Sequence, residues 1–300
     1  MRFASIDIGS NAVRLLLCNV FEKDGETFFK KSELFRMPIR LGEDAFRYKR
    51  ISQEKVMQLC KTMKAFKQLI EVFGAHDYKA CATAAMREAE NGDDIIRIVK
   101  QTSGIEIEIV DGKTEAQIIY SNHIAEHLEK GQSYLYIDVG GGSTELTLFS
   151  DERIIASQSF NVGTIRFLHE QVSKETWSGF KDWIKTNTAG YKPLTGIGSG
   201  GNINKLIKMS GKKESKPITY DRLKELHEYL EHFTIEERIT ELNLNPDRAD
   251  VIVPAAKIFL TIMKNGNINE IIVPQIGLSD GIIHLLYEKH RNMPEIKFEK

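Results

Sequence analysis

The feature that most limits the fold of this chain is a motif that occurs twice. The segments Ser5-Ile-Asp-Ile-Gly-Ser-Asn11 and Tyr136-Ile-Asp-Val-Gly-Gly-Gly-Ser143 are alike, and a short apolar run follows each of them. In both, an apolar strand ends at an aspartate, a glycine turn follows, and a second strand returns. Each copy lies near the start of one half of the chain. We therefore predict two duplicated domains, residues 1–125 and 126–300, with a cleft between them.

Length and periodicity agree with this division. A chain of 300 residues is longer than a single hydrophobic core usually serves. Segments with helical spacing of apolar residues alternate with short apolar runs that are typical of strands. We predict strands at 3–7, 13–20, 79–83, 105–110, 135–137, 145–149, 153–161, 194–197 and 270–273, and helices at 52–73, 93–103, 114–130, 177–185, 202–209, 222–232, 234–242, 250–264 and 280–290. This alternation indicates an α/β protein.

Charge and composition exclude several classes of protein. A net charge of −1 gives no general attraction for nucleic acid, so the counter-charge for any polyanion must be local. No apolar run approaches the roughly 20 residues that span a membrane, and the start of the chain lacks the regions of a signal peptide. Cys18, Cys60 and Cys81 are odd in number and have unrelated spacings. This pattern indicates free thiols in a reducing compartment. We expect a cytoplasmic protein that binds neither nucleic acid nor membrane.

The second copy of the motif has the side chains of a phosphate site. Consecutive glycines leave backbone amides open to an anion, hydroxyl groups add donors, and carboxylates suit a Mg²⁺ that bridges to phosphate. The candidate phosphate ligands are Gly140, Gly141, Gly142, Ser143 and Thr144, and the candidate metal ligands are Asp138 and Glu145. The alternative is a tight hairpin that needs glycine only for its shape. The motif is neither a P-loop nor a dinucleotide fingerprint.

Two further turns are candidates for the same site. Ser10 and Asn11 lie in the first copy of the motif and would form the opposite wall, although a plain asparagine turn is an equal alternative. Thr83 and Arg87 follow a short strand of small residues, where an arginine can bind a phosphate with two hydrogen bonds. The alternative there is a packed turn with a solvated arginine. The glycine turn at 198–201, before a helix, is equally consistent with anion binding and with packing.

Glu115 lies at the start of a predicted helix, next to Thr114. We predict that Thr114 caps the helix, with Gln117 completing a capping box. The helix dipole would keep Glu115 ionised, the state a general base requires, but carboxylates are common in first turns for dipole reasons alone. Farther along, His123-Ile-Ala-Glu-His127 matches a zinc-peptidase pattern. No third ligand is evident, so a solvated helix face is the preferred interpretation.

Taken together, these segments resemble the exopolyphosphatase/guanosine pentaphosphate phosphohydrolase (Ppx/GppA) family, which has the actin-like ATPase (ribonuclease H-like) superfold. The resemblance runs nearly end to end. It rests on the segments Ile6–Asn11, Ala82–Ala89, Thr114–Ala116, Ile137–Glu145, Gly163–Phe167, Gly198–Gly201, Arg248–Ile252 and Leu278–Gly281. Their order and spacing make a chance match improbable.

The resemblance implies a reaction. Glu115 corresponds to the glutamate that activates water for attack on a terminal phosphoryl group, and Asp138 and Glu145 to residues linked to a required Mg²⁺. The substrate would be inorganic polyphosphate or, alternatively, guanosine pentaphosphate. A non-catalytic polyphosphate sensor and a kinase of the same superfold are less favoured. A homodimer is expected from the family only.

Two departures from the family pattern bear on substrate choice. Gln117 stands where an arginine is usual, which removes a cation near Glu115. The chain also has the length of a short, two-domain form of the family. Long members carry additional C-terminal helical domains that help to bind extended polyphosphate.

Overall fold

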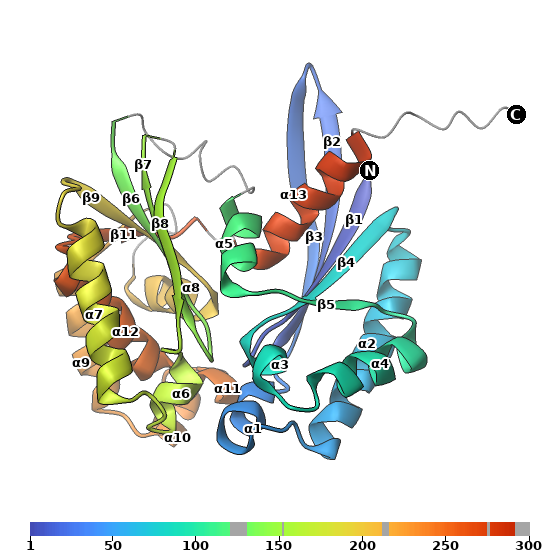
Figure 1. The fold of residues 1–300 in the computed structure, drawn as a ribbon, viewed down its shortest axis with the longest axis horizontal. Coiled ribbons are helices and arrows are strands. Elements are labelled where there is room, and N and C mark those ends of the chain that lie inside the picture. Colours follow the sequence, from blue (N-terminus) through green and yellow to red (C-terminus); the bar gives the residue numbers. More distant parts are fainter. Residues whose placement is uncertain (121–130, 152, 212–215, 275–276, 292–300) are drawn as a thin grey trace, which may run out of the picture.

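The structure is a computed structural model that describes residues 1–120, 131–151, 153–211, 216–274 and 277–291. It contains two β-sheets with helices around them (Figure 1). The predicted zinc-peptidase pattern at 123–127 and the predicted helix beyond residue 120 lie outside the described residues. Within the described residues, no helix is both long enough and apolar enough to cross a membrane.

The first sheet has the strand order β3-β2-β1-β4-β5. Strands β1 to β3 form an antiparallel meander, and β4 and β5 continue from β1 in parallel. The strands are β1 (Arg2–Ile8), β2 (Val13–Lys23), β3 (Glu26–Met37), β4 (Asp77–Ala82) and β5 (Ile107–Ile109). The helices of this half are α1 (Leu41–Tyr48), α2 (Gln53–Phe73), α3 (Ala84–Glu88), α4 (Gly92–Ser103) and α5 (Gly112–Tyr120).

The second sheet has the order β10-β11-β9-β6-β7-β8. Its strands are β6 (Ser133–Val139), β7 (Thr144–Ser150), β8 (Arg153–Phe160), β9 (Leu194–Ser199), β10 (Ile218–Thr219) and β11 (Glu270–Ile272). The helices are α6 (Thr164–Leu168), α7 (Lys174–Thr188), α8 (Gly201–Met209), α9 (Tyr220–Glu231), α10 (Ile235–Thr240), α11 (Pro246–Ala249), α12 (Ile252–Gly266) and α13 (Leu278–Arg291).

The two sheets share one topology. Strands β8, β7, β6, β9 and β11 of the second sheet occupy the places that β3, β2, β1, β4 and β5 hold in the first, and only the two-residue β10 is additional. The meander is antiparallel in both, and the strand beside its first member is parallel in both. This repeated order confirms the prediction of a duplicated α/β fold of the actin-like type.

Helix α13 belongs to the second half in sequence and packs against the first sheet. Figure 1 shows it beside α5 and in front of β1 to β3. The Ser5 hydroxyl donates to the Ser279 carbonyl oxygen at 2.8 Å, and Lys289 pairs with Asp77 at 2.8 Å. Apolar side chains of α13, including Ile282, share a buried cluster with β1, β2, α5 and the near face of the second sheet. The predicted boundary at 125/126 assigns α13 to the second domain, although this helix packs against the sheet of the first.

Two other clusters complete the core. One lies between the first sheet and α2, where Leu59 and Met63 are fully buried. The other lies between the second sheet and α12, with Phe259 and Ile262.

Helix α2 ends at Gly74, which has a φ of +67°. Its backbone N–H donates to the carbonyl oxygens of the last turn, as a left-handed C-terminal glycine does. The chain then turns into β4.

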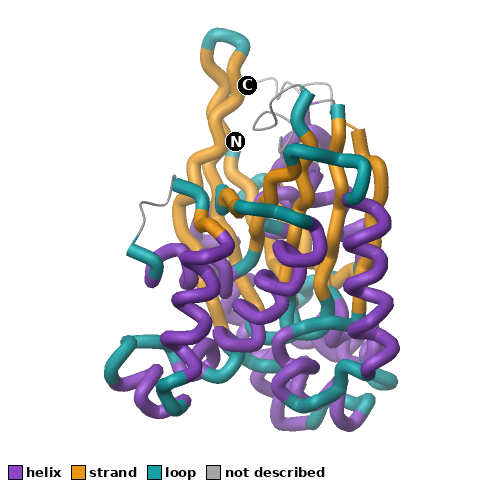
Figure 2. Tube along the Cα trace, turned by 90° about the vertical axis from the view of Figure 1, so that its left-hand side faces the viewer, coloured by secondary structure: helices purple, strands orange, loops and turns teal. Residues whose placement is uncertain are grey.

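The sequence predictions missed several elements that matter for the site. Among them are β3, α1, α3 and α6. The hairpin of β2 and β3 extends past the other strands (Figure 2), so much of β3 is exposed on both faces. The three helices are short, with five to eight residues each, and a short helix gives little periodic signal.

Candidate active site

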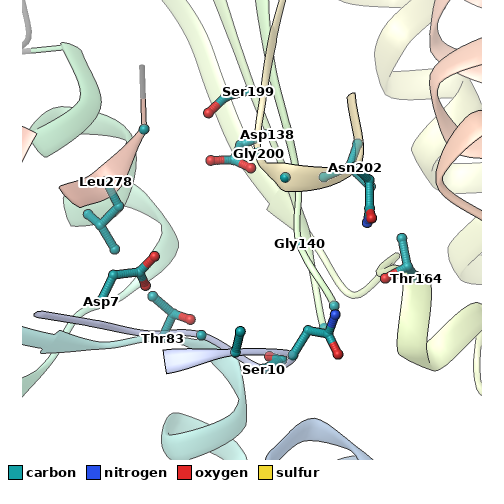
Figure 3. Close-up of a pocket in the computed structure, with 18 of the residues that line it drawn as sticks. Asp7, Ser10, Thr83, Asp138, Gly140, Thr164, Ser199, Gly200, Asn202 and Leu278 are labelled. Carbon is teal, nitrogen blue, oxygen red and sulfur yellow. The ribbon is translucent and has the colours of Figure 1, made fainter. Parts of the chain in front are cut away.

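The carboxyl ends of equivalent strands meet around one pocket. Asp7, near the end of β1, pairs with Cys81 of the parallel strand β4, and Thr83 follows that strand. Asp138 of β6 pairs in the same way with Ser199 of β9. Figure 3 shows Asp7, Ser10 and Thr83 on one side of the pocket and Asp138, Ser199 and Gly200 on the other. Ligand sites of open α/β sheets lie at this end of the strands.

Most of the predicted site residues line this pocket. They are Ser10, Asn11, Thr83, Glu115, Asp138, Gly140, Gly141, Gly142, Ser143 and Glu145. The two copies of the repeated motif thus form opposite walls. The glycine turn at 198–201, left open between two interpretations, also contributes Ser199, Gly200 and Gly201 to the lining.

The carbonyl groups of the triple-glycine turn all point at α6. Thr164 N–H donates to Gly140 O at 3.0 Å, and Ile165 N–H donates to Gly141 O at 2.8 Å. The Arg166 Nε–H donates to Gly142 O at 2.7 Å. In a planar trans peptide the N–H points opposite to the C=O. The amides of residues 141–143 therefore face away from α6, an arrangement that can bind an anion.

The turn needs glycine because other residues approach it closely. A Cβ on Gly142 would lie 2.2 Å from the ring of Phe46, and one on Gly141 would lie 3.1 Å from the Cβ of Ser10. Contact with Ser10 and Phe46 means that the turn packs directly against the first half. The glycines therefore provide both open amides and close packing, and the two interpretations of the motif are compatible.

Asp138 and Glu145 are directly opposite one another on β6 and β7. Such pairs place their side chains on one face of the sheet. Burial raises the pKa of Asp138 to about 6, against the lowering effect of the Arg14 charge. Burial also raises the pKa of Glu145 to about 7. After burial, the negative charge of Asp138 is the largest cause of the raised pKa of Glu145. The pair is a buried concentration of negative charge that a proton or a cation would stabilise.

Glu115 joins this group from the first turn of α5. Asp111, rather than Thr114, caps the helix, because the Asp111 carboxylate accepts from Thr114 N–H at 2.7 Å. The predicted capping box is therefore wrong, and the helix begins at Gly112. The predicted effect of the dipole is also not the dominant one. Burial and the charges of Glu145, Asp138 and Asp7 raise the pKa of Glu115 well above its usual range.

Two of the predicted phosphate ligands, Thr144 and Arg87, do not line the pocket. The Thr144 hydroxyl is fully buried and donates to Val162 O, so this side chain stabilises the sheet. Arg87 donates to Val110 O at 2.8 Å and does not line the pocket. Its charge lowers the pKa values of Glu115 and Glu145. Gln117, which replaces the usual arginine, is exposed and does not line the pocket.

Three arginines that the sequence did not single out line the pocket: Arg14, Arg36 and Arg248. Arg14 pairs with Asp7 at 2.8 Å and Arg36 pairs with Asp247. Arg248 donates to Gly201 O and has no carboxylate partner among the residues that the structure describes. Burial, together with Arg36 and Arg14, lowers the pKa of Arg248. Guanidinium groups of this kind can bind phosphate oxygens.

Comparison with known proteins identifies the family of this chain. The model of the Ppx/GppA phosphatase family matches residues 32–290. A bifunctional 3-dehydroquinate synthase/phosphatase of Fusobacterium nucleatum is 31% identical over 274 residues, which are 83% of this chain and 41% of that protein. This chain thus spans less than half of that relative. Exopolyphosphatase 1 of Mycobacterium tuberculosis is 22% identical over 303 residues, 94% of this chain and 87% of that one.

Solved structures give the same result. The Ppx/GppA family member of Aquifex aeolicus has a TM-score of 0.76 to this structure at 26% identity, and the match covers 98% of this chain and 99% of that one. Since the family model spans most of the chain, the prediction of a phosphoanhydride hydrolase is confirmed at the level of the family. The chain belongs to the Ppx/GppA phosphatase family.

Proposed function

We propose that this protein is an exopolyphosphatase that uses water to release orthophosphate from the end of inorganic polyphosphate. The observation that carries the proposal is that the Glu115 carboxylate and the amides of the glycine turn line one pocket. Phosphoryl transfer to water needs a positioned nucleophile and neutralised phosphate oxygens rather than covalent catalysis. The pocket contains groups for both tasks.

The terminal phosphate would be bound between the two walls. In the proposal, the amides of residues 141–143 and the Ser143 hydroxyl contact it from one side, and Ser10, Asn11 and Thr83 from the other. The three arginines would bind the phosphates that follow. Arg248 is the strongest candidate, because burial without a carboxylate partner is unfavourable for its charge and a phosphate would relieve that cost.

Glu115 would accept the proton of the attacking water. A general base works best when its pKa lies near the working pH. The raised pKa of Glu115 fits this requirement better than an ordinary carboxylate would. Bound cations near Asp138 and Glu145 would offset part of the rise.

The donor set fits Mg²⁺. Asp138 and Glu145 offer hard carboxylate oxygens on one face of the sheet, and Mg²⁺ commonly takes one or two carboxylates, with waters and substrate phosphates as its other ligands. Among the described residues, no three acidic, histidine or cysteine side chains could hold a metal by themselves. We propose that these two residues hold Mg²⁺, which when bound would neutralise charge on the phosphates.

The metal-free protein should lose stability as the pH rises from about 4 to 7. The pKa values of Asp138 and Glu145 are higher in the folded protein than in the unfolded chain. Folding therefore binds protons, and its free energy becomes less favourable as these carboxyls ionise, by on the order of a few kcal/mol. Thermal unfolding with a chelator, compared with Mg²⁺, measures this.

Mg²⁺ should raise the thermal midpoint of unfolding more at pH 8 than at pH 5, because the Asp138 and Glu145 carboxyls are ionised at pH 8. The variant Glu145→Gln should flatten the pH dependence, whereas Glu106→Gln, at an exposed position, should not. Equal Mg²⁺ stabilisation at both pH values would count against these ligands.

Three substrates distinguish the proposed activity from its alternatives. Purified protein with Mg²⁺ should release orthophosphate from long-chain polyphosphate faster than from tripolyphosphate or guanosine pentaphosphate. Faster release from guanosine pentaphosphate would replace the proposal with a nucleotide phosphohydrolase. Binding of polyphosphate without any release would indicate a sensor.

A further inference from the structure

We propose that Arg166 is a positioning residue, which holds the glycine turn in the orientation that binds phosphate and links it to the first half of the molecule. This inference rests on the proposed function, since it concerns the phosphate-binding side of the same pocket. Arg166 does not line the pocket. Its effect on the reaction would come entirely through the backbone of the turn.

The side chain of Arg166 makes three different contacts. Its Nε–H donates to Gly142 O at 2.7 Å. Its Nη2 pairs with the Glu88 carboxylate, and its guanidinium lies 4.0 Å from the centre of the Phe46 ring. Arg166 is 6% exposed, and the contacts use distinct parts of one planar group. The Arg166 guanidinium is therefore held in one orientation and is not a solvated surface charge.

The contact with Gly142 O fixes the one peptide of the turn that α6 backbone groups do not hold. Gly140 O and Gly141 O accept from backbone amides of α6. Gly142 O accepts from the Arg166 side chain instead. The peptide joining residues 142 and 143 therefore depends on this side chain for its direction, and with it the N–H of Ser143.

The contact with Glu88 connects the two walls of the pocket. Glu88 is the last residue of α3, whose preceding residue, Thr83, lines the opposite wall. Phe46 belongs to α1 of the same half and also touches Gly142 closely enough to exclude a side chain there. Arg166 thus sets the separation of the Thr83 wall and the glycine wall through one partly buried ion pair.

The variant Arg166→Lys tests this role. Lysine keeps the charge but lacks the planar group that bonds to Gly142 O and Glu88 together. We expect kcat to fall about 100-fold, since displacements near 1 Å in a phosphoryl-transfer site have effects of this size. We also expect the affinity for inorganic phosphate, measured by calorimetry in the presence of Mg²⁺, to fall about tenfold.

Matched variants separate positioning from simple folding. Lys49→Gln removes an exposed partner of the same Glu88 carboxylate, 3.9 Å away, and should leave both kcat and phosphate affinity unchanged. Glu88→Gln should give an intermediate loss, and it decides the question if Arg166→Lys does not fold. The losses in the double variant should be less than additive, because both residues act in one link.

A purely structural role predicts a different result. The thermal midpoint of Arg166→Lys would fall, yet at a temperature where the variant is folded its kcat and phosphate affinity would match the wild type, and this outcome would overturn the inference. Phosphate binding needs no turnover. If the wild-type protein released no orthophosphate from polyphosphate, the proposed function would fail, while the comparison of phosphate affinities would still test the role of Arg166.

Discussion

Glu115→Gln should lower the rate of orthophosphate release from polyphosphate by about 10²- to 10⁴-fold, the usual contribution of a general base. Polyphosphate binding should stay near its wild-type level, because the glycine turn and the arginines are untouched. The protein should also be as stable or more stable at pH 8. Burial and neighbouring carboxylates raise the pKa of Glu115, so its ionised form opposes folding above that pKa, and the neutral amide removes this cost.

The combination of lost turnover and retained stability is the informative result. Glu106→Gln, on an exposed carboxylate of the same half, serves as the matched control and should change neither quantity. In the wild type, kcat/KM should rise with pH across the raised pKa of Glu115, because a base acts only when deprotonated. Turnover of Glu115→Gln within tenfold of the wild type would remove Glu115 from the mechanism.

Gly163→Ala, a small substitution outside the pocket, should displace the glycine turn and so lower both activity and stability. A Cβ on Gly163 would lie 2.4 Å from Gly141 O and 2.4 Å from the carbonyl carbon of Gly142. Both are backbone atoms of the turn, so the turn itself must move. We expect activity to fall about 100-fold and the free energy of unfolding to fall by about 1–3 kcal/mol, as in other overpacked sites. Steady-state kinetics and urea unfolding measure the two effects.

Gly179→Ala is the matched control for that substitution. Gly179 lies inside α7, and a Cβ there meets nothing within 4 Å. Alanine should stabilise this helix by up to about 1 kcal/mol without changing the kinetics. Wild-type activity in Gly163→Ala would mean that the position of the turn is not set by α6.

The two walls of the pocket were predictable because the motif that builds each of them is local. A strand, an aspartate, a glycine turn and a returning strand are encoded within about a dozen residues. Asp7 and Asp138 therefore fell on opposite sides of one pocket, as the repeat indicates. The direction of the turn amides was not predictable, because it depends on α6 and Arg166, more than 20 residues later in the chain.

Two of the pocket arginines, Arg14 and Arg36, lie on the β2–β3 hairpin, whose register is irregular. The third, Arg248, lies on the four-residue helix α11, which gives little periodic signal. Pairing of β2 with β3 shifts between Leu17 and Cys18 and leaves Ser32 as an additional residue on β3. Each such insertion reverses the faces to which the following side chains point. Arg36 therefore faces the pocket, although the alternation earlier in the strand does not indicate it. Arg87 was predicted to line the pocket, but the five-residue helix α3 directs its side chain to Val110 O. So short a helix was not evident in the sequence.

The position of α13 has a consequence for the order in which the protein folds. Ser5 and Ser279 are 274 residues apart and bond directly, and the apolar face of β1 and β2 is covered by α13. During synthesis at about 5–20 residues per second, the first sheet waits roughly 10 to 30 s between the emergence of α5 and that of α13. Over that interval its apolar face lacks its native cover. The pocket is completed only when α13, which contributes Leu278 to its lining, has been synthesised.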